Sequence, residues 1–238
     1  MKEELSLPLN EKCKIAIIGL GYVGLPLAVE FSKNSNCLIT GKKLERKVIG
    51  FDISKKRIYG LRDFYDYTNQ FSEKELKDLK NIEFTNEEEL LKEADVFIIT
   101  VPTPIDEFNI PDLTALKEAS TLVGKALSKK TNNFKPIVIY ESTVFPGATQ
   151  DVCIPLLSKI SDLKLNEDYF CGYSPERINP GDKKNTLTNI VKITSGSNED
   201  VAEWIDLLYG SIINAGTYKV ESIMIAETAK IIENTQRD

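Results

Sequence analysis

KIAIIGLGYVGLPLAV, residues 14–29, is the stretch that decides the fold. Its first part, residues 14–20, is an apolar run of the length of a buried strand, and residues 24–33 have the periodicity of an amphipathic helix. The turn between them reads G-x-G-x-x-G. Glycine-rich turns are common, so the pattern alone is weak, but a strand before it and a helix after it are the context of a dinucleotide-binding turn. We therefore predict that this turn binds a dinucleotide.

The residues of this turn have separate expected roles. Gly19 permits the tight turn, Gly21 lets a pyrophosphate approach the backbone, and Gly24 lets the helix pack closely against the strand. The helix that follows presents free N–H groups and the positive end of its dipole to phosphates. The predicted cofactor contacts in this turn are Gly19, Gly21, Tyr22, Val23 and Gly24. The alternative is a strand–turn–helix in which the glycines serve packing alone.

An acidic residue after the second predicted strand favours NAD as the cofactor. This strand, residues 47–52, ends in Asp52, which can accept both adenosine ribose hydroxyls and would repel the 2′-phosphate of NADP. The acid follows the glycine turn at a longer spacing than usual, which we explain by an inserted loop at 32–47. In the alternative, Asp52 only caps the next helix. Arg57, one turn into a helix at 54–63, is predicted to reach a phosphate; otherwise it is a solvated surface cation.

The rest of the chain continues the alternation of strand and helix. Further strands are expected at 82–85, 95–101, 136–142, 169–174, 189–196 and 217–220, and further helices at 72–80, 86–94, 111–128, 149–161, 198–213 and from Ser222 onward. Repeated alternation with uncharged strands indicates an α/β fold, a Rossmann-like doubly wound parallel sheet covered on both faces. We expect a tail at 1–12, one domain at 13–220 and the start of a long connecting helix at 221–238.

Composition excludes several classes of protein. The net charge of −6 argues against nucleic acid as the main partner. The N-terminal residues lack the apolar segment of a signal peptide, and no uncharged run is long enough to span a membrane. Four scattered cysteines predict reduced thiols in a cytoplasmic protein, with neither disulfides nor a metal site. The chain has no histidine, so acid–base work falls to Glu, Asp, Lys, Tyr or Cys.

Three motifs go beyond a generic nucleotide fold. VPTP (101–104), ESTVFPGAT (141–149) and GYSPERINPGDK (172–183) each follow a predicted strand, at the edge where open α/β sheets bind ligands. Together with residues 14–28 and the closing AETAKIIENTQRD (226–238), they resemble the UDP-glucose/GDP-mannose dehydrogenase family. The SPERINPGDK version most resembles the branch that oxidises UDP-N-acetylhexosamines.

This resemblance implies an activity and a three-part organisation. Family members have an NAD-binding domain, a long central helix used in dimerisation, and a C-terminal domain that helps to bind the nucleotide sugar. They oxidise the C6 alcohol of a UDP-sugar to a carboxylate with two NAD⁺, which serves surface-polysaccharide precursor synthesis. Their nucleophilic cysteine lies in the C-terminal domain. We therefore expect this chain to hold the first domain and the beginning of the central helix, to form a homodimer in its full-length form, and to be inactive alone.

The resemblance also implies individual roles. Lys230 resembles the family's active-site lysine and Asn234 its partner amide, whereas the sequence alone suggests an exposed helix face. Glu176 resembles the carboxylate that activates the hydrolytic water, and Thr143 the threonine that positions this water. Their alternatives are a loop acid that supports a turn and, with Ser142, a strand-end cap. The further expected cofactor contacts are Thr103, Ser142, Thr143 and Glu176.

Some features limit what the resemblance can carry. UDP-glucose members have a second glutamate four residues after the first, where this chain has Pro180. Cys153 and Cys171 are expected to be buried thiols rather than nucleophiles. The competing hypotheses are a UDP-glucose or GDP-mannose 6-dehydrogenase and a non-catalytic dinucleotide-binding module. A hydroxyacid dehydrogenase would not explain the motifs at 141–149 and 172–183.

Overall fold

A computed structural model describes residues 7–33, 35–105, 107–108, 110–130, 134–177 and 187–237. The strands are β1 (Lys14–Ile18), β2 (Lys47–Phe51), β3 (Ile82–Thr85), β4 (Val96–Ile99), β5 (Ile137–Tyr140), β6 (Phe170–Tyr173), β7 (Lys192–Gly196) and β8 (Thr217–Lys219). The α-helices are α1 (Gly24–Ser32), α2 (Lys55–Arg62), α3 (Glu73–Lys77), α4 (Thr114–Ser128), α5 (Ile154–Ser161), α6 (Glu199–Gly210) and α7 (Ile223–Arg237). The other helical elements are the 3₁₀ helices η1 (Glu88–Glu93) and η3 (Leu187–Asn189) and the π-helix η2 (Thr149–Cys153).

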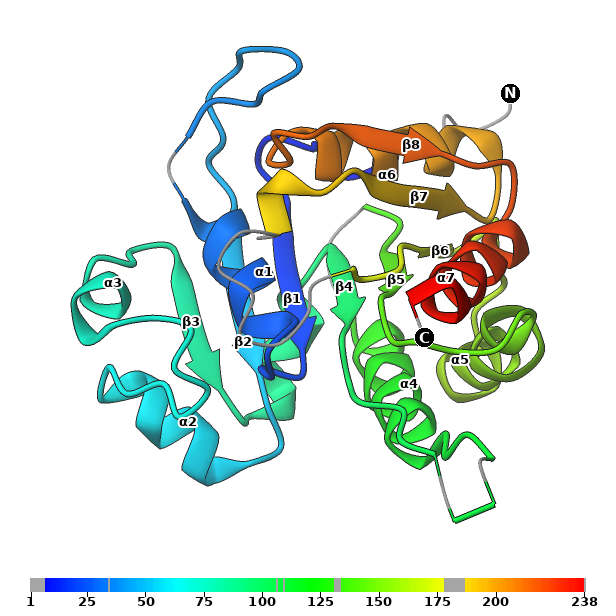
Figure 1. The fold of residues 1–238 in the computed structure, drawn as a ribbon, viewed down its shortest axis with the longest axis horizontal. Coiled ribbons are helices and arrows are strands. Elements are labelled where there is room, and N and C mark those ends of the chain that lie inside the picture. The colour runs from blue at the N-terminus through cyan, green and yellow to red at the C-terminus, as the bar shows by residue number, and fades with distance from the viewer. Residues whose placement is uncertain are drawn as a thin grey trace.

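The strands form one sheet in the order β3-β2-β1-β4-β5-β6-β7-β8 (Figure 1). β1 pairs in parallel with β2 on one side and with β4 on the other. The direction in which successive strands are added therefore reverses between β1 and β4, and ligands of open α/β sheets bind at such a switch point, beyond the carboxyl ends of the strands. The predicted fold class, a Rossmann-like doubly wound sheet, is confirmed.

The expectation of a wholly parallel sheet is wrong at one junction. β7 runs antiparallel to β6, with Gly172 opposite Gly196, and β8 then pairs in parallel with β7. A parallel neighbour needs a long crossover connection, usually a helix. The sequence predicted no helix between 174 and 189, which is consistent with the reversed direction of β7, whereas α6 connects β7 to its parallel neighbour β8.

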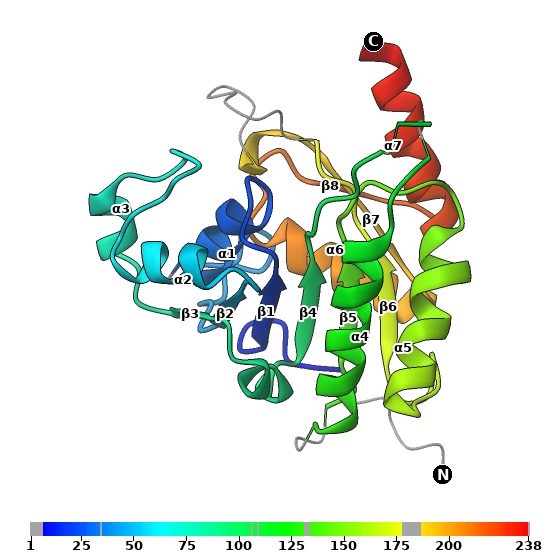
Figure 2. The same ribbon diagram turned by 90° about the horizontal axis from the view of Figure 1, so that it is seen from below.

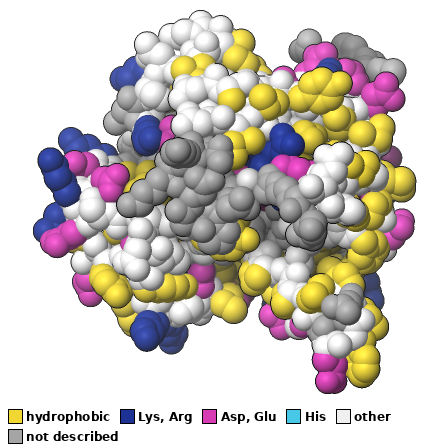
Figure 3. Space-filling view, viewed as in Figure 1, with side chains coloured by type: hydrophobic (Ala, Val, Ile, Leu, Met, Phe, Trp, Pro, Cys, Tyr) yellow, Lys and Arg dark blue, Asp and Glu magenta, His cyan; other side chains and the backbone are white. Residues whose placement is uncertain are grey.

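The last helix stands at the carboxyl edge of the sheet. α7 rises past this edge, with the C-terminus near its tip (Figure 2). It begins at Ile223, one residue after the predicted start, and its first turns are held against the loop after β5. In the view of Figure 1, hydrophobic side chains lie along the right-hand margin of the surface, in the region of α5 and α7 (Figure 3).

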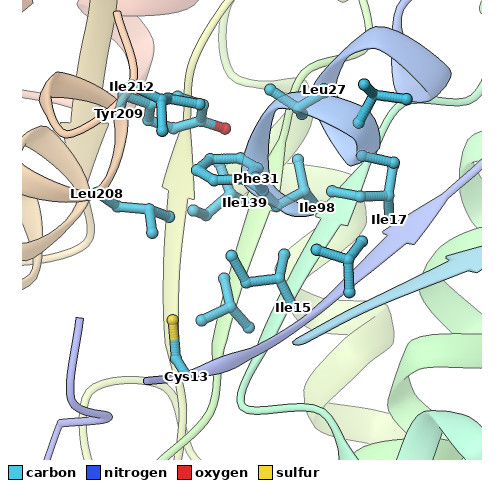
Figure 4. Packing of buried hydrophobic residues seen from close by; sticks show 14 of the residues in the cluster. Cys13, Ile15, Ile17, Leu27, Phe31, Ile98, Ile139, Leu208, Tyr209 and Ile212 are labelled. Carbon is cyan, nitrogen blue, oxygen red and sulfur yellow. The ribbon is translucent and has the colours of Figure 1, made fainter. Parts of the chain in front are cut away.

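Alternating side chains of the strands build two cores. Ile15 and Ile17 of β1 face one cluster, which α1 and α6 cover with residues such as Phe31 and Tyr209 (Figure 4). Ala16 and Ile18 face the second cluster, which α4 and α5 cover. The strands contribute apolar side chains to both clusters, as is expected for a sheet with helices on each side.

Two predicted helices differ in kind from the expectation. The segment 86–94 forms the 3₁₀ helix η1 from Glu88 to Glu93 rather than an α-helix; its N-cap, Glu87, has no side-chain capping bond. Short connectors of this kind adopt the tighter 3₁₀ form readily. The segment 149–161 begins as the π-helix η2, and the α-helix α5 starts only at Ile154, with Pro155 in its first turn.

The described part of the tail, residues 7–12, and Arg46 of the 32–47 segment pack against the body of the domain. The Trp204 indole N–H in α6 donates to the Pro8 carbonyl at 2.8 Å, and Arg46 Nε donates to the Asn10 carbonyl at 2.7 Å. Among the described residues of 32–47, an isolated bridge joins Asn36 and Lys43, and no named strand or helix lies between the ends of α1 and β2; that this segment is an insertion stays a prediction. The predicted boundary at residue 13 stays a prediction.

Candidate functional site

The glycine turn after β1 is locked by its neighbours. Gly19 has a φ of +96°, a conformation that a side chain disfavours. The Thr100 hydroxyl donates to the Gly19 carbonyl at 2.8 Å. A Cβ on Gly24 would lie 1.9 Å from that same carbonyl oxygen, so this glycine is required by the packing of α1 against the turn. Gly19 and Gly24 thus have the structural roles predicted for them.

Gly21 differs, because no described residue occupies the space beside it. A Cβ built on Gly21 meets no heavy atom within 4 Å. The next helix, α1, has Val23 at its N-cap position without a side-chain capping bond, and it has no acid in its first turn. Open space above the backbone, an uncapped N-terminus and an uncompensated helix dipole together suit the diphosphate of a dinucleotide. The residues present therefore fit NAD.

Asp52 lies at the carboxyl end of β2, facing the same turn. One carboxylate oxygen accepts the Leu20 N–H at 2.9 Å and the other accepts the Ser54 N–H at 2.8 Å. The α2 cap is Ser54, whose side chain accepts from the Arg57 N–H, so capping of this helix does not require Asp52. Both oxygens keep lone pairs for the hydroxyls of a ribose.

Arg57 is buried, which excludes the alternative of a solvated surface cation. Its Nη1 lies 2.7 Å from Asp66, its Nε donates to the Leu20 carbonyl at 2.8 Å, and its guanidinium stacks 4.3 Å from the Tyr67 ring centre. Its Nη2 is buried without a hydrogen-bond partner among the described residues. Arg57 does not line either of the cavities described below, so its predicted phosphate contact stays a prediction.

Two cavities lie along the carboxyl edge of the sheet, on either side of the β1 turn. One, of about 590 Å³, contains Asp52 and residues of α4. The other, of about 440 Å³, is lined by Gly19, Gly21, Tyr22, Val23, Thr100, Val101, Pro102, Thr103, Pro104, Glu141, Ser142, Thr143, Glu176 and Lys230. They share Gly19, Val101 and Pro102, so they form two ends of one crevice. An extended ligand can pass over the glycine turn from one end to the other.

The loops after β4 and β5 are tied together in this second cavity. The Ser142 hydroxyl donates to the Val101 carbonyl at 2.6 Å, and the Thr103 hydroxyl donates to the Thr143 carbonyl. These bonds fix the VPTP loop against the ESTVFPGAT loop. Thr143 itself is exposed in the cavity wall, where its hydroxyl is available to a ligand.

The helix α7 contributes Lys230 to this cavity. Glu227, one turn earlier and fully buried, accepts the N–H groups of Gly147 and Thr149 at 2.6 Å and 2.9 Å. This anchor fixes α7 on the loop after β5 and turns Lys230, which is 8% exposed, into the cavity. Asn234, one turn further on, is half-buried and is not among the residues that line the cavity.

Glu176, in the loop after β6, lines the same cavity as Lys230. One of its carboxylate oxygens accepts the Arg177 N–H at 2.5 Å, and the other lies 3.2 Å from the ammonium of Lys192. The part of the predicted motif from 178 to 183, including Pro180, lies outside the described residues. The structure thus brings Glu176, Thr143 and Lys230 together in one cavity, and the catalytic roles expected for them stay predictions.

Two charged residues of the site were missed from the sequence. Glu141, at the end of β5, and Lys192, at the start of β7, form a buried ion pair of 2.8 Å, and Glu141 also accepts the Tyr209 hydroxyl hydrogen. A signal was present for Lys192, since a lysine at the start of an otherwise uncharged buried strand needs a buried partner. Its partner could not be found, because Glu141 is 51 residues earlier in the chain.

No thiol of the chain lines the cavity that contains Glu176 and Lys230. All four cysteines are free and buried. Burial raises the pKa of Cys153 to about 11 and that of Cys171 well above its usual range. The expectation that both are buried thiols is confirmed. Within the described residues, no cluster of His, Cys, Asp and Glu could hold a metal ion, and no helix has the length and apolar character needed to cross a membrane.

Comparisons with known proteins place this chain in a family. The model of the UDP-glucose/GDP-mannose dehydrogenase family, NAD binding domain, matches residues 13–213. The chain is 54% identical over 228 residues to a UDP-N-acetyl-D-glucosamine 6-dehydrogenase of Salmonella typhi, covering 96% of this chain and 50% of the relative. It is 53% identical over 225 residues to the enzyme of the same name from Pseudomonas aeruginosa, covering 94% of this chain and 50% of the relative.

Solved structures agree on the fold. The UDP-D-ManNAc dehydrogenase of Pyrococcus horikoshii superimposes with a TM-score of 0.79 at 29% identity, covering 94% of this chain and 50% of that one. A GDP-mannose dehydrogenase ternary complex from Pseudomonas aeruginosa gives a TM-score of 0.82 at 23% identity, covering 94% and 49% of the two chains, and this likeness concerns the fold alone. The chain spans about half the length of the curated relatives it matches.

Proposed function

Because the chain belongs to the UDP-glucose/GDP-mannose dehydrogenase family and matches its NAD binding domain, we propose that it is the NAD-binding part of a UDP-N-acetylhexosamine 6-dehydrogenase. The proposed reaction oxidises the C6 alcohol of the sugar to a carboxylate with two NAD⁺ and supplies precursors of surface polysaccharides. The single observation that carries the proposal is the cavity in which Glu176, Thr143 and Lys230 meet beside the glycine turn.

NAD⁺, when bound, supplies the hydride acceptor. The backbone at Gly21 and the N-terminus of α1 hold its diphosphate, and Asp52 accepts the ribose hydroxyls. The cavity on the far side of the turn then receives the nicotinamide end beside Glu176 and Lys230. A carboxylate at Asp52 disfavours a 2′-phosphate, so we expect NAD⁺ to be preferred over NADP⁺.

The remaining groups act on the sugar. The ammonium of Lys230 holds the oxygen at C6 and stabilises negative charge that develops there. Glu176 accepts a proton from the water that attacks the thioester carbon, the bond from this carbon to the family's cysteine sulfur breaks to release the acid and the thiolate, and Thr143 orients this water. Asn234, on the next turn of α7, is assigned to the same oxygen on the family resemblance alone. The fixed position of Glu176 and the anchored helix carrying Lys230 support these assignments.

A UDP-N-acetylglucosamine substrate is favoured by the names of two relatives that are 54% and 53% identical to this chain. The relatives named as UDP-N-acetyl-D-mannosamine dehydrogenases are more distant, at 32% identity or below. We propose that this chain alone binds NAD⁺ without turnover, since its four thiols are all buried. A cytoplasmic location and a homodimer formed through α7 are part of the same proposal.

The test is a substrate panel with the protein of the full natural reading frame. UDP-N-acetylglucosamine, UDP-N-acetylgalactosamine and UDP-glucose are incubated with NAD⁺, and NADH is counted against acid formed. We expect two NADH per uronic acid with an N-acetylhexosamine and loss of overall oxidation in Lys230→Ala. Faster turnover of UDP-glucose would refute the substrate class, and normal turnover by Lys230→Ala would refute the site.

A further inference from the structure

Lys192 lies between the carboxylates of Glu141 and Glu176, and these two glutamates line the cavity of the candidate active site. Its ammonium is 2.8 Å from Glu141 Oε2 and 3.2 Å from Glu176 Oε2, and it also lies 3.3 Å from the Pro175 carbonyl oxygen. The three charged side chains come from the ends of three adjacent strands, β5, β6 and β7. Lys192 is 3% exposed, Glu141 2% and Glu176 8%, so all three charges are held away from bulk water.

Each hydrogen-bonding group of this cluster is used. Glu141 accepts from Lys192 with one oxygen and from the Tyr209 hydroxyl with the other. Glu176 accepts from Lys192 and from the Arg177 N–H. The three protons of the lysine ammonium match its three acceptors, the two carboxylates and the Pro175 carbonyl. The Glu176 carboxylate is therefore fixed in direction as well as in position.

The charge balance of the cluster depends on this lysine. Burial acts to lower the pKa of Lys192, but Glu141 and Glu176 outweigh burial and raise it, so the side chain is a cation at neutral pH. Burial raises the pKa of Glu141, Lys192 opposes the rise, and the charge on Glu176 adds to it. Two buried carboxylates without a cation between them would share a proton, because like charges in close proximity disfavour double ionisation.

Other charged groups reach the cluster from neighbouring elements. Lys230 of α7 lines the same cavity, and Tyr209 of α6 places its ring 5.2 Å from the Lys192 ammonium. Arg177, next to Glu176, directs its guanidinium to Glu233 of α7 at 2.7 Å. Lys192 contacts both carboxylates directly.

We propose that Lys192 is a positioning residue for Glu176, holding its carboxylate in the cavity wall and preventing Glu141 and Glu176 from sharing a proton, so that Glu176 is free to accept one. The assignment of Glu176 as the base rests on the proposed function, whereas the effect of Lys192 on the carboxylate pair does not. Lys192 itself touches neither substrate nor cofactor in this account.

The first test needs no turnover. This chain is labelled with ¹³C at the glutamate side-chain carboxyls, and the carboxyl signals are titrated with pH; Glu141→Gln and Glu176→Gln identify the two signals. We expect the Glu141–Glu176 pair in Lys192→Met to take up its first proton about one pH unit higher than in the wild type. The double variant Lys192→Met/Glu141→Gln, which removes the repelling carboxylate, should return the remaining signal toward the wild-type midpoint.

A further variant covers the case in which Lys192→Met fails to fold. Glu141→Gln keeps the lysine and removes its second carboxylate, so the remaining carboxyl should take up a proton at lower pH than the wild-type pair. The matched control is Lys130→Met, which removes another buried lysine, 3.1 Å from Asp95 at the opposite edge of the sheet. An unchanged titration of the pair in both Lys192→Met and Glu141→Gln, or in the one that folds, would overturn the proposal.

The second test connects the cluster to catalysis in the full-length protein. We expect the acidic limb of the pH profile of kcat to move up by about one pH unit in Lys192→Met, with the KM for the nucleotide sugar changed less than about twofold, and no such movement in Lys130→Met. If the titration shifts in Lys192→Met but the full-length wild type does not oxidise nucleotide sugars, the proposed function is refuted and the positioning role of Lys192 stands. Normal turnover with an unshifted titration and an unshifted limb would refute the positioning alone.

Discussion

Arg177 donates from Nε to a carboxylate oxygen of Glu233 at 2.7 Å, and this ion pair ties the loop after β6 to α7. Glu176 directly precedes Arg177, and Lys230 lies three residues before Glu233 on the same helix. The pair therefore sets the separation between the candidate base and the candidate lysine from outside the cavity. Both side chains are partly shielded from water, at 27% and 17% exposure.

We expect this ion pair to contribute to the docking of α7. A double-mutant cycle with Arg177→Met and Glu233→Gln, measured by urea unfolding, should give a coupling energy of about 1 kcal/mol. The control is the pair Lys164–Glu167, whose side chains are 75% and 67% exposed and which should show no measurable coupling. Equal coupling in the two cycles would mean that Arg177 does not hold α7.

The glycines of the β1 turn should separate binding from folding. Gly21→Ala places its Cβ in open space, so the free energy of unfolding should stay within about 0.5 kcal/mol of the wild type while NAD⁺ affinity falls at least about tenfold. Gly24→Ala places its Cβ against the Gly19 carbonyl and should cost at least about 2 kcal/mol of stability. Calorimetric titration and thermal unfolding measure the two effects. Unimpaired NAD⁺ binding by Gly21→Ala would contradict the assignment of the diphosphate site.

The buried pair of Arg57 and Asp66 should make stability depend on acid pH. Burial acts to raise the pKa of Asp66, but hydrogen bonds from Thr68 and Arg57 outweigh burial, so its pKa is lowered in the folded protein. A lowered folded pKa contributes stability that is complete above the unfolded value of about 3.9 and is lost as the pH falls through the folded value.

Asp66→Asn should therefore destabilise the protein by about 3 kcal/mol at pH 7, because it leaves Arg57 buried without its partner. The difference between wild type and variant should stay constant down to about pH 5 and shrink below about pH 4, as measured by urea unfolding at each pH. The exposed Glu73→Gln serves as the control and should leave the curve unchanged. A difference that is the same at pH 3 and pH 7 would show that the Asp66 charge is not the source of the stability.

The exposed apolar side chains of α7 predict self-association. Ile225 and Ile232 are seven residues apart on this helix and are 45% and 55% exposed. In the full-length protein, Ile225→Asp/Ile232→Asp should convert a dimer to a monomer, as measured by light scattering during gel filtration, because two charges would be buried at the interface. Tyr59→Asp/Tyr65→Asp, at exposed aromatic residues outside α7, should leave the dimer intact. A dimer that survives the α7 substitutions would place its interface elsewhere.

The sequence predicted those parts of the site that rest on local pattern. The strand, turn and helix at 14–33 were predictable because periodicity and glycine spacing are properties of neighbouring residues. Glu176, Thr143 and Lys230 came from a family resemblance, and the structure places all three in one cavity. The type and the ends of the elements were less well predicted. The segment 86–94 was expected to be a helix over its whole length, and it forms the 3₁₀ helix η1 at Glu88–Glu93.

Features that depend on distant partners could not be predicted. The burial of Arg57 could not be predicted, because its partner, Asp66, lies in a polar loop nine residues on. The ion pair of Glu141 and Lys192 joins the ends of β5 and β7, which lie on opposite sides of β6 in the sheet. No local sequence pattern specifies that arrangement. The antiparallel direction of β7 likewise depends on how the chain returns to the sheet, which periodicity does not specify.

A crystal structure of this chain grown with NAD⁺ tests the central claim most directly. We predict density for the diphosphate over Gly21 and the first amides of α1, for the adenosine ribose at Asp52, and for the nicotinamide in the cavity of Glu176 and Lys230. Coenzyme bound at another place, or a crevice without density at a saturating NAD⁺ concentration, would contradict the account.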